Sequence, residues 1–404
     1  MNVRCAIAGG GPAGMMLGFL LARAGIEVAV VEKHADFFRD FRGDTIHPST
    51  LQLMYELGLL DAFLARPHNE LTQLTGSIDD RLVTIADFSR LPTHSKFIAL
   101  MPQWDFLDFL AEQGKKYAGF RVMMQADVTE LLRDGERISG VRAQTPDGPV
   151  EIKADLVVGA DGRSSTVRAL SGLTVEDFGA PMDVLWMRIS RDPNGPRQTF
   201  GNIRDGRLLV SLDRGDYWQV AFVIAKGTFP ELQTAGIDAL RRMMVATAPF
   251  LSDRINEIQD WTQVSLLTVK IDRLAKWYRD GLLCIGDASH AMSPIGGVGI
   301  NLAIQDAVAS ANLLAAPLRD GTLDTNDLRE VQRRREFPAK VIQRGQIFVQ
   351  ERLVKRVLTG GAISKLPLVL RLLQHVPPLQ SIPAYIVGVG VRPEHVRTPE
   401  VLPG

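Results

Sequence analysis

The sequence predicts an α/β fold in which a parallel sheet carries an inserted antiparallel sheet and a helical C-terminal tail. Residues 3 to 32 read as strand, glycine turn, helix and strand, which is a βαβ unit. Buried strand-like runs return at 154 to 160 and 282 to 286, each ending in glycine-bearing segments. Between about 176 and 272, short strands rich in aromatic residues alternate with turns, which is typical of an antiparallel insertion.

Composition excludes several classes of function. The 404 residues include 46 basic and 46 acidic side chains, so the zero net charge gives no electrostatic reason to expect nucleic acid as a partner. Cys5 and Cys284 lie inside apolar runs, where we expect buried core residues and no disulfide framework. No Cys/His cluster has the spacing of metal ligands, so we expect no metal. These features predict a cytoplasmic protein.

The first glycine segment, Gly9-Gly10-Gly11-Pro12-Ala13-Gly14, follows a strand and opens a helix. In this pattern the first glycine permits a tight turn, the second lets a pyrophosphate approach, and the third allows close helix–strand packing. Free N–H groups at the helix start favour phosphate. Glu32 ends the second strand, where an acid bonds the ribose hydroxyls of an adenosine, and Lys33 follows it. This Rossmann-like segment fits a nicotinamide dinucleotide as well as a flavin.

Two later segments favour the flavin. Asp161-Gly162 follows one buried strand, and Gly286-Asp287 follows another. The loop Pro294 to Gly299 then leads into a helix, and its glycines let the backbone lie against a flat ring. The N–H groups at this helix start, around Gly299, Ile300 and Asn301, would stabilise the anion at the pyrimidine edge of a reduced flavin.

The run Asp161-Gly162-Arg163-Ser164-Ser165-Thr166-Val167-Arg168 is close to the pattern Asp-Gly-x-x-Ser-x-x-Arg, and Gly286-Asp287-Ala288-Ser289-His290 matches Gly-Asp-Ala-x-His. With these motifs, residues 1 to about 345 resemble the FAD-dependent aromatic hydroxylases, single-component flavoprotein monooxygenases of the para-hydroxybenzoate hydroxylase type. The resemblance implies FAD as cofactor, with NADH or NADPH as a transient reductant. It implies that O2 forms a flavin C4a-hydroperoxide, which hydroxylates an aromatic or similar electron-rich small molecule.

The resemblance also implies roles for single residues. Asp287 would bond a ribityl hydroxyl, Asp161 would brace the phosphate region, and Pro294 would lie beside the oxygen-reacting face of the flavin as the one catalytic candidate, with no general base identified. Arg42 and Gln103 would contact the pyrophosphate or the ribityl chain, although either could equally be a surface group. The expected cofactor-binding residues are Gly9, Gly11, Pro12, Ala13, Gly14, Glu32, Lys33, Arg42, Gln103, Val128, Asp161, Gly286, Asp287, Pro294, Gly297, Gly299, Ile300 and Asn301.

Candidate substrate residues are His47, Trp186 and Tyr217, because the inserted sheet should roof the flavin. Simple packing explains these aromatic residues equally well. Strand alternation puts Tyr217 and Gln219 on one face and Trp218 on the other. We interpret His290 as a brace for the cofactor loop, and the run Arg333-Arg334-Arg335 as a solvated helix face.

We expect three regions. The FAD-binding domain is discontinuous, at 1–70, 98–175 and 273–345; the substrate domain combines 71–97 with 176–272; the C-terminal helical tail is 346–404. The apolar tail could cover the protein itself, form a dimer contact or touch a membrane, and we favour the first. The sequence leaves monomer and homodimer open.

Two other functions remain open. One is an FAD-dependent reductase or dehydrogenase of an isoprenoid or quinone-like substrate, which shares the cofactor fold. The other is a non-catalytic flavin-binding module, against which the intact Pro294 to Gly299 run argues, because a binding module needs no site for a reduced-flavin anion.

Overall fold

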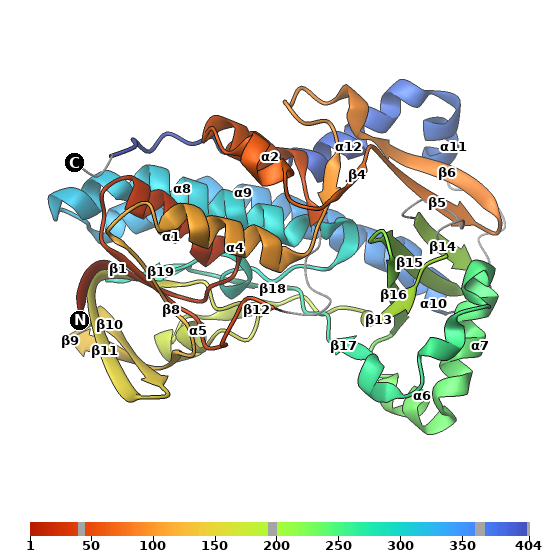
Figure 1. The fold of residues 1–404 in the computed structure, drawn as a ribbon, viewed down its shortest axis with the longest axis horizontal. Coiled ribbons are helices and arrows are strands. Elements are labelled where there is room, and N and C mark those ends of the chain that lie inside the picture. Colours follow the sequence, from red (N-terminus) through yellow and green to blue (C-terminus); the bar gives the residue numbers. More distant parts are fainter. Residues whose placement is uncertain (39–44, 193–199, 360–367, 402–404) are drawn as a thin grey trace.

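The computed structural model of the chain describes residues 1–38, 45–192, 200–359 and 368–401. Within them, a sheet of eight strands forms one half of the molecule (Figure 1). Its strand order is β19-β20-β11-β1-β2-β8, and the strands β10 and β9 extend it from one end of β11. The strands are β1 (Asn2–Ala8), β2 (Val28–Val31), β8 (Phe120–Met123), β9 (Asp127–Asp134), β10 (Arg137–Thr145), β11 (Gly148–Gly159), β19 (Tyr278–Arg279) and β20 (Leu282–Cys284).

The centre of this sheet is parallel, and its strands end together. Ala8 pairs with Val31 on one side and with Gly159 on the other, and Gly159 pairs with Cys284. These strands are apolar without alternation because both faces are covered; Cys5 and Cys284, for example, are fully buried. The predicted parallel sheet is therefore confirmed, and the carboxyl ends of four strands share one edge.

Four helices form a layer over one face of the sheet (Figure 1). They are α1 (Pro12–Arg23), α4 (Gln103–Gly114), α8 (Val298–Asp320) and α9 (Thr325–Val349). Among the described residues, one helical stretch, Ile295–Asp320, is long and apolar enough to cross a membrane by length and composition, but 78% of its apolar 18-residue stretch is buried inside the molecule. It serves here as the central core helix, packed between α1 and α9.

The second sheet has the order β17-β13-β16-β15-β14-β5-β6. Its strands come from two separate stretches of the chain, and the junction between them, β14–β5, is a parallel pair. The sheet predicted as antiparallel is therefore mixed at that one pair. The strands are β5 (Gln73–Ile78), β6 (Arg81–Asp87), β13 (Met182–Ser190), β14 (Phe200–Arg204), β15 (Arg207–Asp213), β16 (Tyr217–Ala225) and β17 (Ser265–Leu267).

One face of this second sheet is covered by α6 (Phe229–Ala235) and α7 (Ile237–Thr247). Smaller elements connect the two halves. They are α2 (Pro48–Glu56), α3 (Leu60–Leu64), α5 (Thr166–Ser171), the three-stranded sheet β3 (Thr45–Ile46), β7 (Ile98–Leu100) and β4 (Asn69–Leu71), and the pair β12 (Val175–Asp177) and β18 (Asp272–Leu274).

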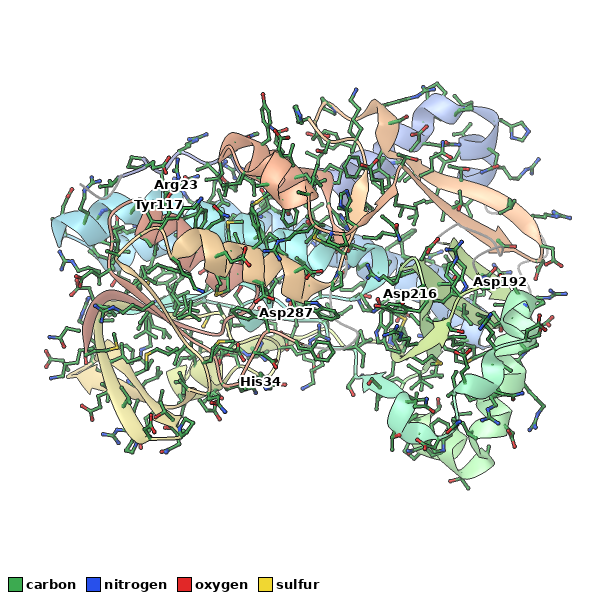
Figure 2. All side chains as sticks on the ribbon, in the orientation of Figure 1. Arg23, His34, Tyr117, Asp192, Asp216 and Asp287 are labelled. Carbon is green, nitrogen blue, oxygen red and sulfur yellow. The ribbon has the colours of Figure 1, made fainter. Side chains whose placement is uncertain are left out.

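The C-terminal region packs back onto both halves. A π-helical turn (Gln350–Val354) and α10 (Lys355–Leu358) continue α9, and α11 (Leu368–His375) and α12 (Ser381–Gly388) lie against β6. The final segment, 389–401, returns along α8 and α1. There the Glu400 carboxylate accepts hydrogen bonds from the Tyr117 hydroxyl at 2.7 Å and from Arg23 at 3.2 Å (Figure 2).

Candidate active site

The predicted motifs meet at the shared edge of the parallel strands. Gly9 follows β1, Glu32 follows β2, and the Asp161 and Gly286 segments follow β11 and β20. Backbone hydrogen bonds hold these ends in place, from Gly9 N to Val31 O at 2.8 Å and from Ile285 N to Gly159 O at 3.0 Å. Ligands of open α/β sheets bind outside the carboxyl ends of the strands, so this edge is the candidate site.

The first glycine turn has both the close packing and the open space that a pyrophosphate requires. A Cβ on Gly14 would lie 1.9 Å from Gly9 O, and a Cβ on Gly9 would lie 2.4 Å from Ala160 O. A Cβ on Gly11, in contrast, would have no atom of the described residues within 4 Å. The helix that begins at Pro12 has no side-chain cap, so its first N–H groups face this open space. These residues fit the phosphates of a dinucleotide.

Glu32 fixes the turn from the adjacent strand. Its carboxylate accepts hydrogen bonds from Gly10 N at 2.9 Å and from His34 N at 3.0 Å. Its carbonyl accepts from Ala126 N at 2.9 Å, which brings the buried Val128 of β9 into the same neighbourhood. Glu32 and Val128, both expected to bind the cofactor, therefore lie on neighbouring segments, while Lys33 is exposed. Ribose binding by Glu32 stays a prediction.

The Asp161 segment is tied to the start of α5 and to Asp287. Asp161 accepts hydrogen bonds from Ser165 Oγ at 2.5 Å and from Val167 N at 3.0 Å. Burial raises the pKa of this carboxyl, and these hydrogen bonds oppose the rise. Arg163 donates to Asp287 at 3.1 Å, which ties this partly exposed carboxylate to the Asp161 segment; Asp287 lies near the middle of the molecule (Figure 2).

Gly286 joins the two helices that flank the site. Its φ is +58°, and an added Cβ would lie 3.0 Å from Ala303 Cβ of α8 and 3.3 Å from Ala13 Cβ of α1. A side chain here would strain the backbone and press both helices apart. The glycine therefore places the starts of α1 and α8 beside the same turn.

The start of α8 is uncapped. Gly297 is left-handed at φ +63°, and within the described part of the chain no side chain caps the helix and no atom lies within 4 Å of a Cβ on Gly299. Asn301 turns inward instead: its Oδ1 accepts from Thr50 Oγ1 at 2.8 Å and from His47 N at 3.2 Å. The free N–H groups and the open space fit the edge of a flat, anion-forming ring.

His47 is buried beside this loop. Its Nδ1 donates to Val387 O of α12 at 2.8 Å, and a Cβ on Gly297 would lie 3.4 Å from its Nε2. Nε2 has no hydrogen-bond partner among the described residues. Burial lowers the pKa of the imidazole to about 4, so it is neutral at pH 7. Substrate contact by His47 stays a prediction.

The Pro294 loop is held from behind by three buried glutamines, which the sequence analysis missed. Gln346 Nε2 donates to the carbonyls of Ser293 and Ile295, both at 3.0 Å, and Gln350 Nε2 donates to Ser293 Oγ at 2.6 Å. Gln343 holds Ala291 O in the same way at 3.0 Å. The spacing i, i+3, i+7 puts all three on one face of α9 and its π-helical extension, and buried glutamine at that spacing was the available signal.

The second sheet presents one face toward this loop. Trp186 and Ile295 pack against the same apolar cluster, which contains Val184 and Val223. Tyr217 shares this face, while Trp218 lies on the opposite face against Phe250, so the predicted alternation is confirmed. Tyr217 pairs with Ser190, four residues and therefore about 13 Å along β13 from Trp186. Trp186 and the loop residue Ile295 thus pack on one apolar cluster, and substrate contact by Trp186 or Tyr217 stays a prediction.

A family model described as an FAD binding domain matches residues 2–345. Over 360 residues the chain is 31% identical to 6-methylpretetramide 4-monooxygenase of Streptomyces rimosus, covering 89% of this chain and 85% of that protein. The chain belongs to the FAD-dependent aromatic hydroxylase family. It is an FAD-dependent monooxygenase, and the resemblance stated from its motifs is confirmed.

Solved structures show the same fold as this hydroxylase. The anhydrotetracycline hydroxylase OxyS of Streptomyces rimosus has a TM-score of 0.77 and 24% identity, with 97% of this chain and 77% of that one covered. PqsL of Pseudomonas aeruginosa, a probable FAD-dependent monooxygenase, has a TM-score of 0.75 and 24% identity, with 89% and 99% covered. The chain spans only 61 to 65% of the length of several other relatives that it matches.

The geometry described above does not test two of the predicted FAD contacts, those of Gln103 and Arg42. Gln103 is the half-buried first residue of α4, which packs on α1, and no hydrogen bond of its side chain is seen within the described part of the chain. Arg42 lies outside the described residues. Both contacts stay predictions.

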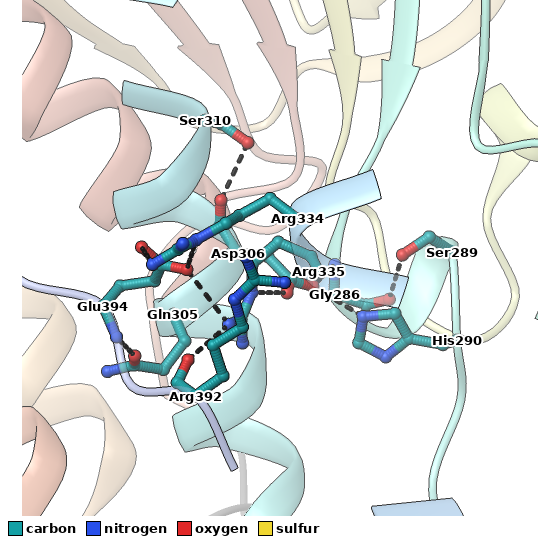
Figure 3. A network of polar contacts seen from close by, with 10 residues as sticks. All are labelled: Gly286, Ser289, His290, Gln305, Asp306, Ser310, Arg334, Arg335, Arg392 and Glu394. Carbon is teal, nitrogen blue, oxygen red and sulfur yellow. Dashed lines mark hydrogen bonds and ion pairs between the residues drawn. The ribbon is translucent and has the colours of Figure 1, made fainter. Parts of the chain in front are cut away.

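The interpretation of Arg333-Arg334-Arg335 as a solvated helix face was wrong for Arg335. Arg333 is exposed, but Arg335 is fully buried and its Nε donates to Asp306 at 2.9 Å (Figure 3). His290, interpreted as a brace, is also buried, with Nε2 2.6 Å from the Asp306 carboxylate. Arg335 is buried because α8 and the C-terminal segment supply carboxylates that the helical pattern of α9 does not reveal.

We expect Gln346→Leu to loosen the Pro294 loop, because it removes both side-chain donors and the acceptor for Ser293 N. Each buried backbone group left unpaired costs about 1 to 3 kcal/mol. The matched control is Gln332→Leu on the same helix, which loses bonds to Trp277 N and Ala275 O, neither of which belongs to the loop. Both variants should lower the unfolding free energy, but only Gln346→Leu should shift the visible absorption spectrum of bound FAD. Identical spectra would contradict this account.

Proposed function

We propose that this protein uses FAD, NAD(P)H and O2 to hydroxylate an aromatic or similarly electron-rich small molecule held between the Pro294 loop and the second sheet. The observation that carries the proposal is the convergence of the Gly9, Asp161 and Gly286 segments with the uncapped start of α8 at one sheet edge. A relative that acts on 6-methylpretetramide supports an aromatic substrate.

Bound FAD would supply the two-electron chemistry and the reaction with O2. The segment Gly9 to Gly14 and Gly286 would hold the phosphates of FAD and the chain that joins them to the flavin ring. Asp287, oriented by Arg163, would accept a hydrogen bond from a ribityl hydroxyl. The uncapped N–H groups from Val298 onward would face the pyrimidine edge and stabilise its negative charge through the helix dipole. Pro294 would lie against the face where the substrate docks.

The second sheet would exclude water from that face. Trp186 and Ile295 share an apolar cluster with Val184, Met182 and Val223, so the wall next to the loop is apolar. Oxygen activated at bound FAD would persist longer in such a pocket, because water and protons are kept away from it. Positioning of the ring by this wall would then decide which carbon is hydroxylated.

A decisive experiment supplies the purified, FAD-loaded protein with NADH or NADPH and a panel of aromatic compounds under 18O2. We expect a substrate that accelerates NAD(P)H oxidation and yields a product carrying one 18O atom. Oxidation of NAD(P)H that yields a reduced product and no label would instead support a reductase of a quinone-like substrate. Flavin that no nicotinamide cofactor reduces, with any compound of the panel, would support a binding module.

We also propose a cytoplasmic location and a tail that covers the protein itself. Hydrogen bonds of the described tail support its packing on the protein: Val387 O of α12 accepts from His47, and Glu400 of the last segment accepts from Arg23 of α1. Membrane flotation of the full chain would test the alternative of a lipid-binding tail.

A further inference from the structure

A buried charged network connects the C-terminal segment, residues 389–401, to the turn at Gly286-Asp287, which is named the cofactor turn (Figure 3). Its centre is Asp306 of α8, which is fully buried. The carboxylate accepts hydrogen bonds from Gly286 N at 3.1 Å and from Arg335 Nε at 2.9 Å, and it contacts His290 Nε2 at 2.6 Å. Gly286 directly precedes Asp287, so Asp306 fixes the backbone at the point where the ribityl-binding residue begins.

The network continues through α9 to the segment 389–401. Arg335 Nη1 donates to Glu394 Oε1 at 3.3 Å and to Arg392 O at 3.2 Å. The buried Glu394 also forms a two-pronged pair with Arg334, at 2.7 and 3.1 Å, and its backbone N–H donates to Gln305. Glu394, which lies 89 positions after Gln305 of α8, thus shares one set of buried charges with the cofactor turn.

Buried charges of this kind hold their geometry only as a set. Arg335 bridges two carboxylates, so the loss of Glu394 would leave Asp306 as the one carboxylate of this bridge and Arg392 O as the remaining acceptor of Nη1. Asp306 would then share its lone pairs differently among Arg335, His290 and Gly286 N. Electrostatic interactions are strong where water is excluded, and neighbouring hydrogen bonds polarise one another. A change in one contact of the network therefore alters the strength of the next.

We propose that Glu394 and Arg335 are positioning residues for FAD, and that the C-terminal segment sets the geometry of the Gly286-Asp287 turn through Asp306. The proposal rests on the FAD assignment and is independent of which substrate is oxidised. It assigns a cofactor role to a segment that follows the matched domain, 2–345, in the chain.

The same segment offers a matched control. Glu400 is anchored to Arg23 and Tyr117 at the far end of α1, and these contacts do not reach the cofactor turn. Glu394→Gln and Glu400→Gln therefore remove one charge each from the same segment, but only the first acts on the network. Glu394 is buried and Glu400 is partly exposed, so the unfolding midpoint of each variant is measured beside its FAD affinity.

The test measures the FAD dissociation constant, the flavin midpoint potential and the urea-unfolding midpoint of the full chain, without substrate. We expect Glu394→Gln to weaken FAD binding at least tenfold and to shift the potential, Glu394→Asp to restore part of both, and Glu400→Gln to stay within twofold of wild type. Arg335→Lys keeps the charge but loses the bridging geometry, so it should resemble Glu394→Gln. It replaces Glu394→Gln in the test if Glu394→Gln does not fold.

Equal FAD affinities and potentials in Glu394→Gln and Glu400→Gln would overturn the proposal, whatever their unfolding midpoints. A wild-type chain that binds no FAD would instead contradict the cofactor assignment. The two failures are therefore distinguishable in one set of titrations.

Discussion

Gly11→Val is expected to abolish FAD binding while leaving the fold of the chain intact. Among the described residues nothing lies within 4 Å of a Cβ at Gly11, and its φ of −76° suits any residue, so the substitution should not strain the backbone. It would instead fill the space before the uncapped start of α1, where a pyrophosphate approaches the backbone. We expect the dissociation constant for FAD to rise by at least about 100-fold, which corresponds to about 2.7 kcal/mol.

The measurement is quenching of FAD fluorescence on titration with protein, together with far-ultraviolet circular dichroism of the same samples. Gly345→Ala is the control, since a Cβ at this helical position in α9 also meets nothing within 4 Å but lies away from the glycine turns. It should bind FAD as wild type does. If Gly11→Val retained wild-type affinity, the pyrophosphate would not lie at the start of α1.

The cofactor side of this structure was predictable because each of its motifs is local. A strand followed by Gly9-x-Gly11-x-x-Gly14 specifies its own turn, and the chain from Gly286 to Asn301 specifies a loop and a helix start. Parallel strands end at one edge, so local motifs at strand ends must converge. The predicted fold class and cofactor are accordingly confirmed.

What sequence reasoning missed depends on contacts between distant segments. The burial of Arg335 requires Asp306 and Glu394, and the glutamines at 343, 346 and 350 acquire their role only when α9 lies behind the Pro294 loop. The parallel pairing of β14 with β5 likewise joins strands more than 100 residues apart. Helical periodicity reports that a face is polar, but not which buried carboxylate or carbonyl it will meet.

Asp306→Asn is expected to produce the largest loss of stability of any single substitution in the charged network. The variant keeps the size of the side chain but leaves Arg335 without its fully buried counter-charge. Removing one partner of a buried ion pair costs about 3 to 5 kcal/mol, because the remaining charge stays in a medium of low dielectric constant. Urea unfolding at pH 7 with saturating FAD measures the loss, and Asp320→Asn, whose partner Arg319 is exposed, should change stability by less than about 0.5 kcal/mol.

The loss should also depend on pH in a defined direction. Burial alone would raise the pKa of Asp306, but His290 and Arg335 outweigh it and hold the pKa below its usual value. A carboxyl whose pKa is depressed by folding stabilises the protein above its unfolded pKa, about 3.9, and loses that contribution as pH falls through the folded pKa. The stability difference between wild type and Asp306→Asn should therefore shrink as the pH falls below about 4. Asn carries no charge at any pH, so the two proteins differ in charge at this position only while Asp306 is ionised. A stability difference that grew as the pH fell below about 4 would therefore contradict the stabilisation of the ionised carboxylate by His290 and Arg335.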